Sequence, residues 1–140
     1  MAISAHDALI YIMVVTASSD TAVTEQELHR IETLISRLPV FEGYDRKELA
    51  ATASRCADLI NGSTGLDGVL DMAIAAIPRR LQDTAYVLAV EVAAVDLKLE
   101  QEELRFLEMI RDRMELDRLV TAAIETAARA RHRRLVPNTH

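Results

Sequence analysis

The chain has 140 residues, of which 50% are hydrophobic and 27% are charged, and its formal net charge at pH 7 is −6. A chain of this length and composition can bury enough apolar surface to fold as one domain without disulfide bonds or a structural metal. The acidic balance, the lack of tryptophan and the small number of other aromatic residues argue against nucleic-acid binding, because phosphates would be repelled and bases would find no stacking platform.

The cysteine content and the apolar runs bear on location. Cys56 is the only cysteine, so it is expected to be a small buried hydrophobe, and a reducing cytoplasm is the expected location. The longest apolar runs, 8–15 and 85–95, are shorter than the roughly 18 residues that a membrane span needs. His6 and Asp7 stand before the first run in place of the basic region of a signal peptide, so neither a membrane span nor a signal peptide is predicted.

A first helix is predicted over residues 3–18, because residues 8–15 would be apolar on every side of it. A helix of this kind is usually central and buried. A β-strand is the alternative, since the run is short and rich in β-branched residues. The helix is favoured because a corresponding stretch later in the chain, residues 84–95, is alanine-rich and lies behind Pro78, a residue suited to the first turn of a helix.

A capping box, Thr24-x-x-Glu27, predicts the start of a second helix that runs to about Arg37, where Pro39 stops it. Its expected core-facing residues recur at spacings of three and four: Leu28, Ile31, Leu34, Ile35 and Leu38. This helix is therefore expected at the surface, with one face toward the core.

Two shorter helices follow. Asp45 with Glu48 is expected to cap a third helix, which Asn61-Gly62 ends. The apolar spacing over residues 66–77 predicts a fourth helix. Both are expected to cover faces of the central helices.

Three further helices are predicted over residues 79–95, 100–113 and 116–134. The last has an expected apolar face of Leu119, Val120, Ala123, Ile124 and Ala127. Its end is basic, through Arg129, Arg131, Arg133 and Arg134, which suits the negative end of a helix dipole, and we assign this end no function. Residues 136–140 are expected to form a flexible tail.

Two stretches of the chain repeat one another at a fixed offset. Residues 20–28 match residues 96–104, and in each copy a glutamate follows an aspartate by seven positions. The match extends over residues 7–35 and 83–111. This internal repeat predicts an all-α, compact bundle of about seven helices, in which two αα-hairpins pack around a pseudo-two-fold axis within one domain over residues 1–135.

The acidic residues of the repeat are the best candidates for a functional site. At about 100° per residue, Glu27 and Glu103 each fall on the apolar side of their helix. A carboxylate directed at a core needs hydrogen-bond donors, a positive partner or a metal. If the hairpins face each other, Asp20 and Asp96 would complete a cleft of four carboxylates. All-oxygen ligands favour calcium, magnesium or manganese over zinc.

The same residues have structural alternatives. Glu27 can accept from the amide of Thr24 as its capping-box partner, whereas Glu100, at the matching position of the second copy, is a poorer cap than threonine. Asp20 and Asp96 can bond their own backbone as turn residues. The residues alone do not decide between metal binding and capping.

Other site types receive little support. Glu91, inside the apolar fifth helix, is expected to form a core salt bridge with an arginine, because its counterpart in the first copy is Val15. The histidines are scattered and are expected to face solvent: His6, His29, His132 and His140. The sequence has no glycine-rich phosphate loop, nucleophile elbow or metalloprotease motif, and the chain is predicted not to be an enzyme.

The repeated motif resembles that of the TerB-like domains of tellurite-resistance proteins. The family motif is Asp-Gly-x-hydrophobic-x-x-x-Glu, and residues 20–27 and 96–103 match it, with Thr21 and Leu97 in place of the glycine. The resemblance implies a compact helical fold with internal pseudo-symmetry and a metal site formed by the two aspartates and two glutamates. It also implies a role in tellurite or general chemical-stress resistance, beside membrane-associated partners.

Two functions of different classes follow from the sequence. In the first, the chain is a non-enzymatic, metal-binding stress-response domain that holds calcium, magnesium or manganese. In the second, it is a metal-free helical adaptor whose acidic surface binds a protein partner, and its carboxylates are caps and salt bridges. A protein partner is expected, nucleic acid and membrane insertion are not, and self-association is left open.

Overall fold

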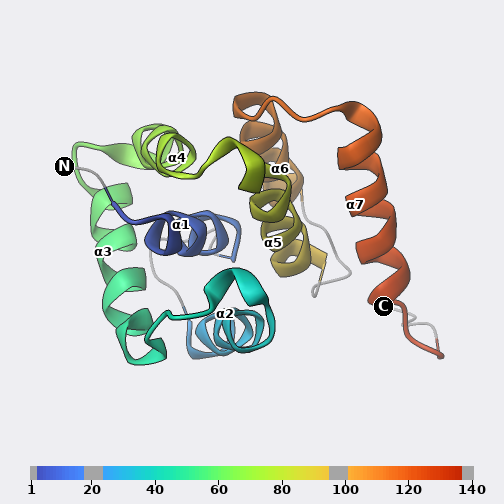
Figure 1. Cartoon of the computed structure of the whole chain (residues 1–140), viewed down its shortest axis with the longest axis horizontal. Helices are drawn as coiled ribbons and strands as arrows, with labels where there is room; N and C mark the ends of the chain where they lie inside the picture. Colours follow the sequence, from blue (N-terminus) through green and yellow to red (C-terminus); the bar gives the residue numbers. More distant parts are fainter. Residues whose placement is uncertain (1–2, 18–23, 95–100, 137–140) are drawn as a thin grey trace.

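The computed structural model describes residues 3–17, 24–94 and 101–136, and for residues 94 and 101–105 it describes the backbone alone. These residues form seven α-helices and three 3-10 helices, with no β-strand among them (Figure 1). The all-α class is therefore confirmed, and the strand alternative for the first helix is wrong. In chain order the elements are α1 (Ala5–Ala17), α2 (Glu25–Arg37), η1 (Pro39–Phe41), η2 (Arg46–Glu48), α3 (Leu49–Asn61), α4 (Gly65–Ala76), η3 (Arg79–Leu81), α5 (Gln82–Ala94), α6 (Gln101–Arg113) and α7 (Arg118–Arg131).

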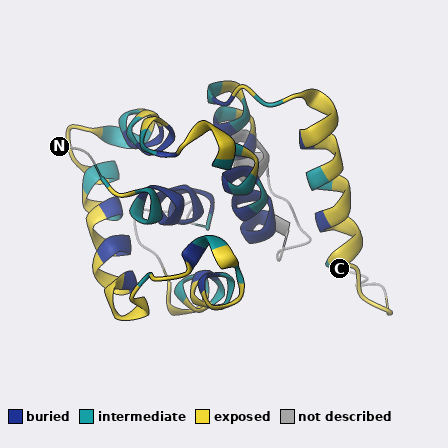
Figure 2. Cartoon of the chain, in the orientation of Figure 1, coloured by how far each residue is buried: buried dark blue, intermediate teal, exposed yellow. Residues whose placement is uncertain are grey.

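Helices α1 and α5 form the centre of the bundle. Every residue of α1 from Ala8 to Thr16 is buried, and Figure 2 shows α5 dark along most of its length. α1 packs against α3, α4, α5 and α6, while α5 also packs against α2, α6 and α7. The prediction that the two apolar helices lie at the centre is confirmed.

Helix α2 is positioned by signals in its own sequence. The Thr24 side chain accepts from the Glu27 amide and the Glu27 carboxylate accepts from the Thr24 amide, so the predicted capping box is present. Ile31 and Ile35 are buried toward the core. The helix ends before Pro39, which begins η1. Both predicted ends are confirmed, because each depends on residues within one turn.

A 3-10 turn precedes α3 and another precedes α5, so both α-helices begin later in the chain than predicted. Asp45 caps η2 by accepting a hydrogen bond from the Lys47 amide, and Glu48 makes no side-chain cap for α3. Likewise η3 precedes α5, which begins at Gln82 rather than at residue 79. In both cases the predicted signal begins a tight turn, and the α-helix follows directly.

Each of the two helix pairs, α1–α2 and α5–α6, contacts the other through its central and outer helices. α1 contacts α6 of the other pair, and α5 contacts α2. A duplicated hairpin would produce reciprocal packing of this kind, although the pseudo-two-fold axis itself stays a prediction. α3 and α4 pack on α1, and α7 packs on α5, so these helices cover the remaining faces as expected (Figure 1).

The predicted apolar face of α7 is wrong. The buried residues of this helix are Thr121 and Ala128, and Ile124 is half-buried. Four of the five residues predicted to face the core are exposed: Leu119, Val120, Ala123 and Ala127. The helix is therefore rotated relative to the prediction, with Leu119 and Val120 toward solvent and Ile124 packed against the core.

Polar contacts set the rotation of α7. Glu125 accepts a hydrogen bond from the Tyr86 hydroxyl of α5, with oxygen atoms 2.6 Å apart, and another from Arg111 of α6 at 3.1 Å. Burial, and then the contact with Glu125, raise the pKa of Tyr86, so its hydroxyl remains a donor. Because the carboxylate must meet both donors, the side of α7 that carries Glu125 is the side turned toward α5.

Candidate functional site

The four predicted metal ligands differ in what the structure describes. Asp20 and Asp96 lie outside the described residues, as do the two residues that replace the family glycine, and for Glu103 only the backbone is described, within α6. Glu27 is the ligand whose side chain is described. Among the described residues, no group of three or more histidine, cysteine, aspartate or glutamate side chains is placed to hold a metal ion.

Glu27 is half-buried at the start of α2. Its Oε1 atom accepts from the Thr24 amide at 3.1 Å, and its own amide donates to the Thr24 hydroxyl at 3.2 Å. The structural alternative considered for this copy is therefore present. The other oxygen, Oε2, takes no part in the capping box, so capping leaves Glu27 one oxygen with which to bind a cation.

Glu91 of α5 is buried and has two basic neighbours from the end of α7. Arg131 forms an ion pair with it, and Nε2 of His132 lies 2.5 Å from its Oε2. Burial, and then the charge of Arg131, lower the pKa of His132, so the ring is neutral at pH 7 and donates its Nε2 hydrogen to the carboxylate. The predicted salt bridge between Glu91 and an arginine is confirmed, and it fixes the end of α7 to α5.

The prediction that the histidines face solvent is confirmed for His29 and wrong for His6 and His132, which are half-buried. Nε2 of His6 lies 2.9 Å from the carbonyl oxygen of Val40, and its ring packs against two aromatic rings. His6 therefore joins α1 to the segment after α2 as a structural residue. His140 lies outside the described residues.

A groove with a volume of about 570 Å³ lies between α2, α5 and α7, and we name it the α2–α5–α7 groove. Four aliphatic side chains line its apolar part: Leu34 of α2, Leu38 directly after α2, and Val87 and Val92 of α5. Polar and charged residues complete the lining: His29, Arg30, Thr33, Arg37, Glu91, Arg131 and His132. An apolar surface bordered by a few charged groups is typical of a ligand site.

Sequence reasoning missed this groove because its lining comes from three helices. Arg30 and Arg37 are seven residues apart on α2, so they lie on one side of that helix, with Leu34 between them. This spacing is visible in the sequence. No local signal, however, places Val87 of α5 or Arg131 of α7 beside it.

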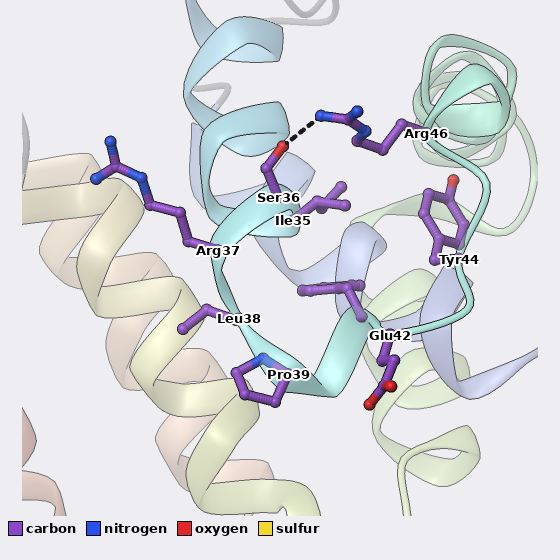
Figure 3. Close-up of a pocket in the computed structure, with 9 residues that line it drawn as sticks. Ile35, Ser36, Arg37, Leu38, Pro39, Glu42, Tyr44 and Arg46 are labelled. Carbon is purple, nitrogen blue, oxygen red and sulfur yellow. Dashed lines mark hydrogen bonds between the residues drawn. The ribbon is translucent and has the colours of Figure 1, made fainter.

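A second cavity, of about 520 Å³, lies where α2 meets η1 (Figure 3). Arg46 donates a hydrogen bond to the Ser36 hydroxyl at 2.9 Å, and Glu42 lies on the same rim. Figure 3 shows the Arg37 side chain extending away from the centre of this cavity. The lining then has one arginine, Arg46, and one acid, Glu42. This cavity therefore has no net charge that would select a ligand.

A third cavity, of about 550 Å³, lies beside α1, α3 and α4 and contains a polar network. Arg55 pairs with one oxygen of Asp7 at 3.5 Å, and the Thr52 hydroxyl donates to the other at 3.3 Å. Burial raises the pKa of Tyr11 on the same wall, so its hydroxyl is protonated at pH 7. Because Asp7 is satisfied by its neighbours, this network is structural.

Cys56 is buried in α3, with its Sγ atom 4.0 Å from the carbonyl oxygen of Tyr11. Burial raises the pKa of its thiol to about 12. The thiolate, which is the nucleophilic form, is therefore scarcely populated at pH 7. The predicted role of Cys56 as a small buried hydrophobe is confirmed.

Two candidate sites result. One is the set of four carboxylates in the repeated turns, and the other is the α2–α5–α7 groove. The described helices are each too short or too polar to cross a lipid bilayer. Comparison of the chain with protein-family models, with curated proteins and with solved structures gives no match.

Proposed function

We propose that the chain is a non-enzymatic, metal-binding helical domain that resembles the TerB-like proteins of tellurite and chemical-stress resistance. The ligands are Asp20, Glu27, Asp96 and Glu103, and the ion is a hard divalent cation, namely calcium, magnesium or manganese. The observation that carries the proposal is the repeated aspartate-to-glutamate spacing, whose glutamate lies in the first turn of α2 in one copy and of α6 in the other.

The packing of the flanking helices supports the proposal. Each repeated segment follows a central helix, α1 or α5, and runs into the first turn of an outer helix, α2 or α6. The two central helices pack on each other, and each also contacts the outer helix of the other copy. An arrangement of this kind allows one site to be shared between the copies.

The position of Glu27 also bears on how many ligands the site needs. Glu27 lies at the start of α2, where the positive end of the helix dipole opposes a cation by roughly 0.3–1 kcal/mol. A single carboxylate supplies at most two of the roughly six to eight oxygen ligands that calcium takes. A motif that occurs twice supplies four carboxylates. Four can bind a divalent ion despite the repulsion from the positive ends of two helices.

Titration calorimetry and thermal unfolding with calcium, magnesium and manganese chlorides test the proposal. An ion that binds the folded state alone stabilises it by about 2.7 kcal/mol at a concentration of 100 times Kd. We expect such stabilisation for the unaltered protein. We expect Glu103→Gln and Asp20→Asn each to weaken binding by roughly tenfold or more, because each removes a charged ligand.

Glu32→Gln and Glu108→Gln are the matched controls for this experiment. These two glutamates occupy equivalent positions in the two copies, and both are exposed. Each control variant should bind the ion as the unaltered protein does. The absence of any binding heat at millimolar concentrations of all three ions would refute the proposal.

A second function, that of a metal-free helical adaptor, is favoured by the complete capping box of Thr24 and Glu27. In this case an acidic surface binds a protein partner, and the carboxylates act as caps and salt bridges. Glu27→Gln should then cost about 1 kcal/mol or less of unfolding free energy, and capture of the partner should survive EDTA. Loss of capture on adding EDTA would contradict the adaptor and favour the metal site.

A further inference from the structure

The α2–α5–α7 groove shares none of its lining residues with the proposed metal site. In its apolar part, Val92 is buried, whereas Leu34, Leu38 and Val87 are only half-buried. These three aliphatic side chains therefore expose apolar surface inside a concave site. Covering that surface with an apolar ligand would be favourable.

The charges around this apolar surface are unbalanced. Glu91, the one acid among the lining residues, is buried and is already paired with Arg131 and His132. Arg30 and Arg37 form no ion pair with any residue that the structure describes. The lining of the groove thus carries more positive than negative side chains, on a chain with a formal net charge of −6.

The size of the groove fits a small ligand. Its volume of about 570 Å³ is in the range of small-molecule pockets. A single flexible alkyl chain can follow the uneven surface between two helices.

We propose that the α2–α5–α7 groove binds a single-chain carboxylate amphiphile of the fatty-acid class. The alkyl chain lies on the aliphatic side chains of α2 and α5, and the carboxylate meets the guanidinium groups of Arg30 and Arg37 at the rim. A guanidinium donates paired hydrogen bonds to a carboxylate. An alkyl ammonium ion of the same length would meet the same arginines with repulsion.

Titration calorimetry with hexanoate, octanoate and decanoate, each below its critical micelle concentration, tests the proposal on the full chain. Each further CH₂ group that the groove buries should tighten Kd about fourfold. Decyltrimethylammonium is the charge control, and it should bind roughly tenfold more weakly than decanoate or worse.

Paired variants locate the site. Arg30→Gln combined with Arg37→Gln should weaken decanoate binding by roughly tenfold or more. Arg80→Gln combined with Arg118→Gln removes the same charge from exposed positions outside the groove, so Kd should change by less than about twofold. Thermal unfolding of both double variants checks that each remains folded, which is expected because the changed side chains lie at the surface.

Three results would each overturn the proposal: no decanoate binding below its micelle concentration, a Kd that does not depend on chain length, or equal weakening by the two double variants. Tighter binding of decyltrimethylammonium than of decanoate would overturn it in favour of a cationic ligand. EDTA should leave decanoate binding unchanged, because the groove and the proposed metal site share no residue. The two proposals can therefore fail independently.

Discussion

Helices α1 and α7 are held in the bundle by different forces. α1 is buried from Ala8 to Thr16 and is surrounded by other helices. α7 buries Thr121 and Ala128, exposes most of its larger apolar side chains, and is attached through the carboxylates of Glu91 and Glu125. The comparison teaches that apolar burial positions the central helix, whereas paired carboxylates position the outer one. Variants that remove apolar volume or carboxylate contacts should therefore act on different helices.

The largest expected effect is the loss of apolar volume at the centre. Ile12 of α1 is 0% exposed and Leu119 of α7 is 78% exposed. We expect Ile12→Ala to cost about 2–5 kcal/mol of unfolding free energy, and Leu119→Ala less than about 0.5 kcal/mol. Urea unfolding of both variants measures the contrast. Equal costs would mean that α7 buries the apolar face that its sequence suggests.

Removal of the charge on Glu91 should release the end of α7. Glu91→Gln keeps the shape of the side chain but removes the negative charge of the carboxylate that Arg131 and His132 both contact. We expect a cost of about 1–3 kcal/mol in urea unfolding, with early loss of hydrogen-exchange protection in the last turn of α7. Glu108→Gln, an exposed change on α6, is the control. Unchanged protection in that turn would contradict the attachment.

The hydroxyl of Tyr86 should contribute less, because Arg111 remains to pair with Glu125. We expect Tyr86→Phe to cost about 1 kcal/mol in urea unfolding. Tyr44→Phe is the matched control, since its hydroxyl makes a longer contact, 3.3 Å to the Thr52 hydroxyl. A cost for Tyr86→Phe no greater than that for Tyr44→Phe would show that the contact with Glu125 does not set the rotation of α7.

The smallest expected effect is the response to acid. Burial, and then Arg131, lower the pKa of His132 below its ordinary value of 6.5. Between the lowered and the ordinary pKa the unfolded chain binds more protons than the folded protein, so the unfolding free energy falls as the pH drops below about 6.5. Measured from pH 7 to pH 5, this fall should be smaller in His132→Gln.

His29→Gln is the control for the acid response, because His29 is exposed on the same groove. It should leave the pH profile of the unfolding free energy unchanged. If His132→Gln and His29→Gln give the same profile, then the burial of His132 beside Arg131 does not cause the response.

The features that the sequence predicted correctly depend on residues close together in the chain, or on a helix that is apolar on every side. Thr24 and Glu27 are three residues apart, so their capping box can be read directly. Residues 8–15 are apolar all round, so α1 is buried whichever side meets the core. Glu91 was predictable in part, because a lone acid in an apolar helix needs a positive partner.

The features that the sequence did not predict depend on distant partners. The rotation of α7 follows from Tyr86 and Arg111, which are 39 and 14 residues from Glu125. The apolar stripe of α7 consists partly of alanine, which has little surface to bury, and so two hydrogen bonds to a carboxylate outweigh it. The four-carboxylate site stays a prediction, because three of its side chains lie outside the part of the chain that the structure describes.

Cys56, the only cysteine of the chain, lies where α3 packs on α1. A thiol-specific label reaches its sulfur when these two helices separate, so the speed of labelling reports how often the interior opens, with no engineered probe. The same burial protects the folded protein in an oxidising solution. A solitary thiol at the surface would cross-link one molecule to another, and this one is kept apart from its counterparts for as long as the helices stay together.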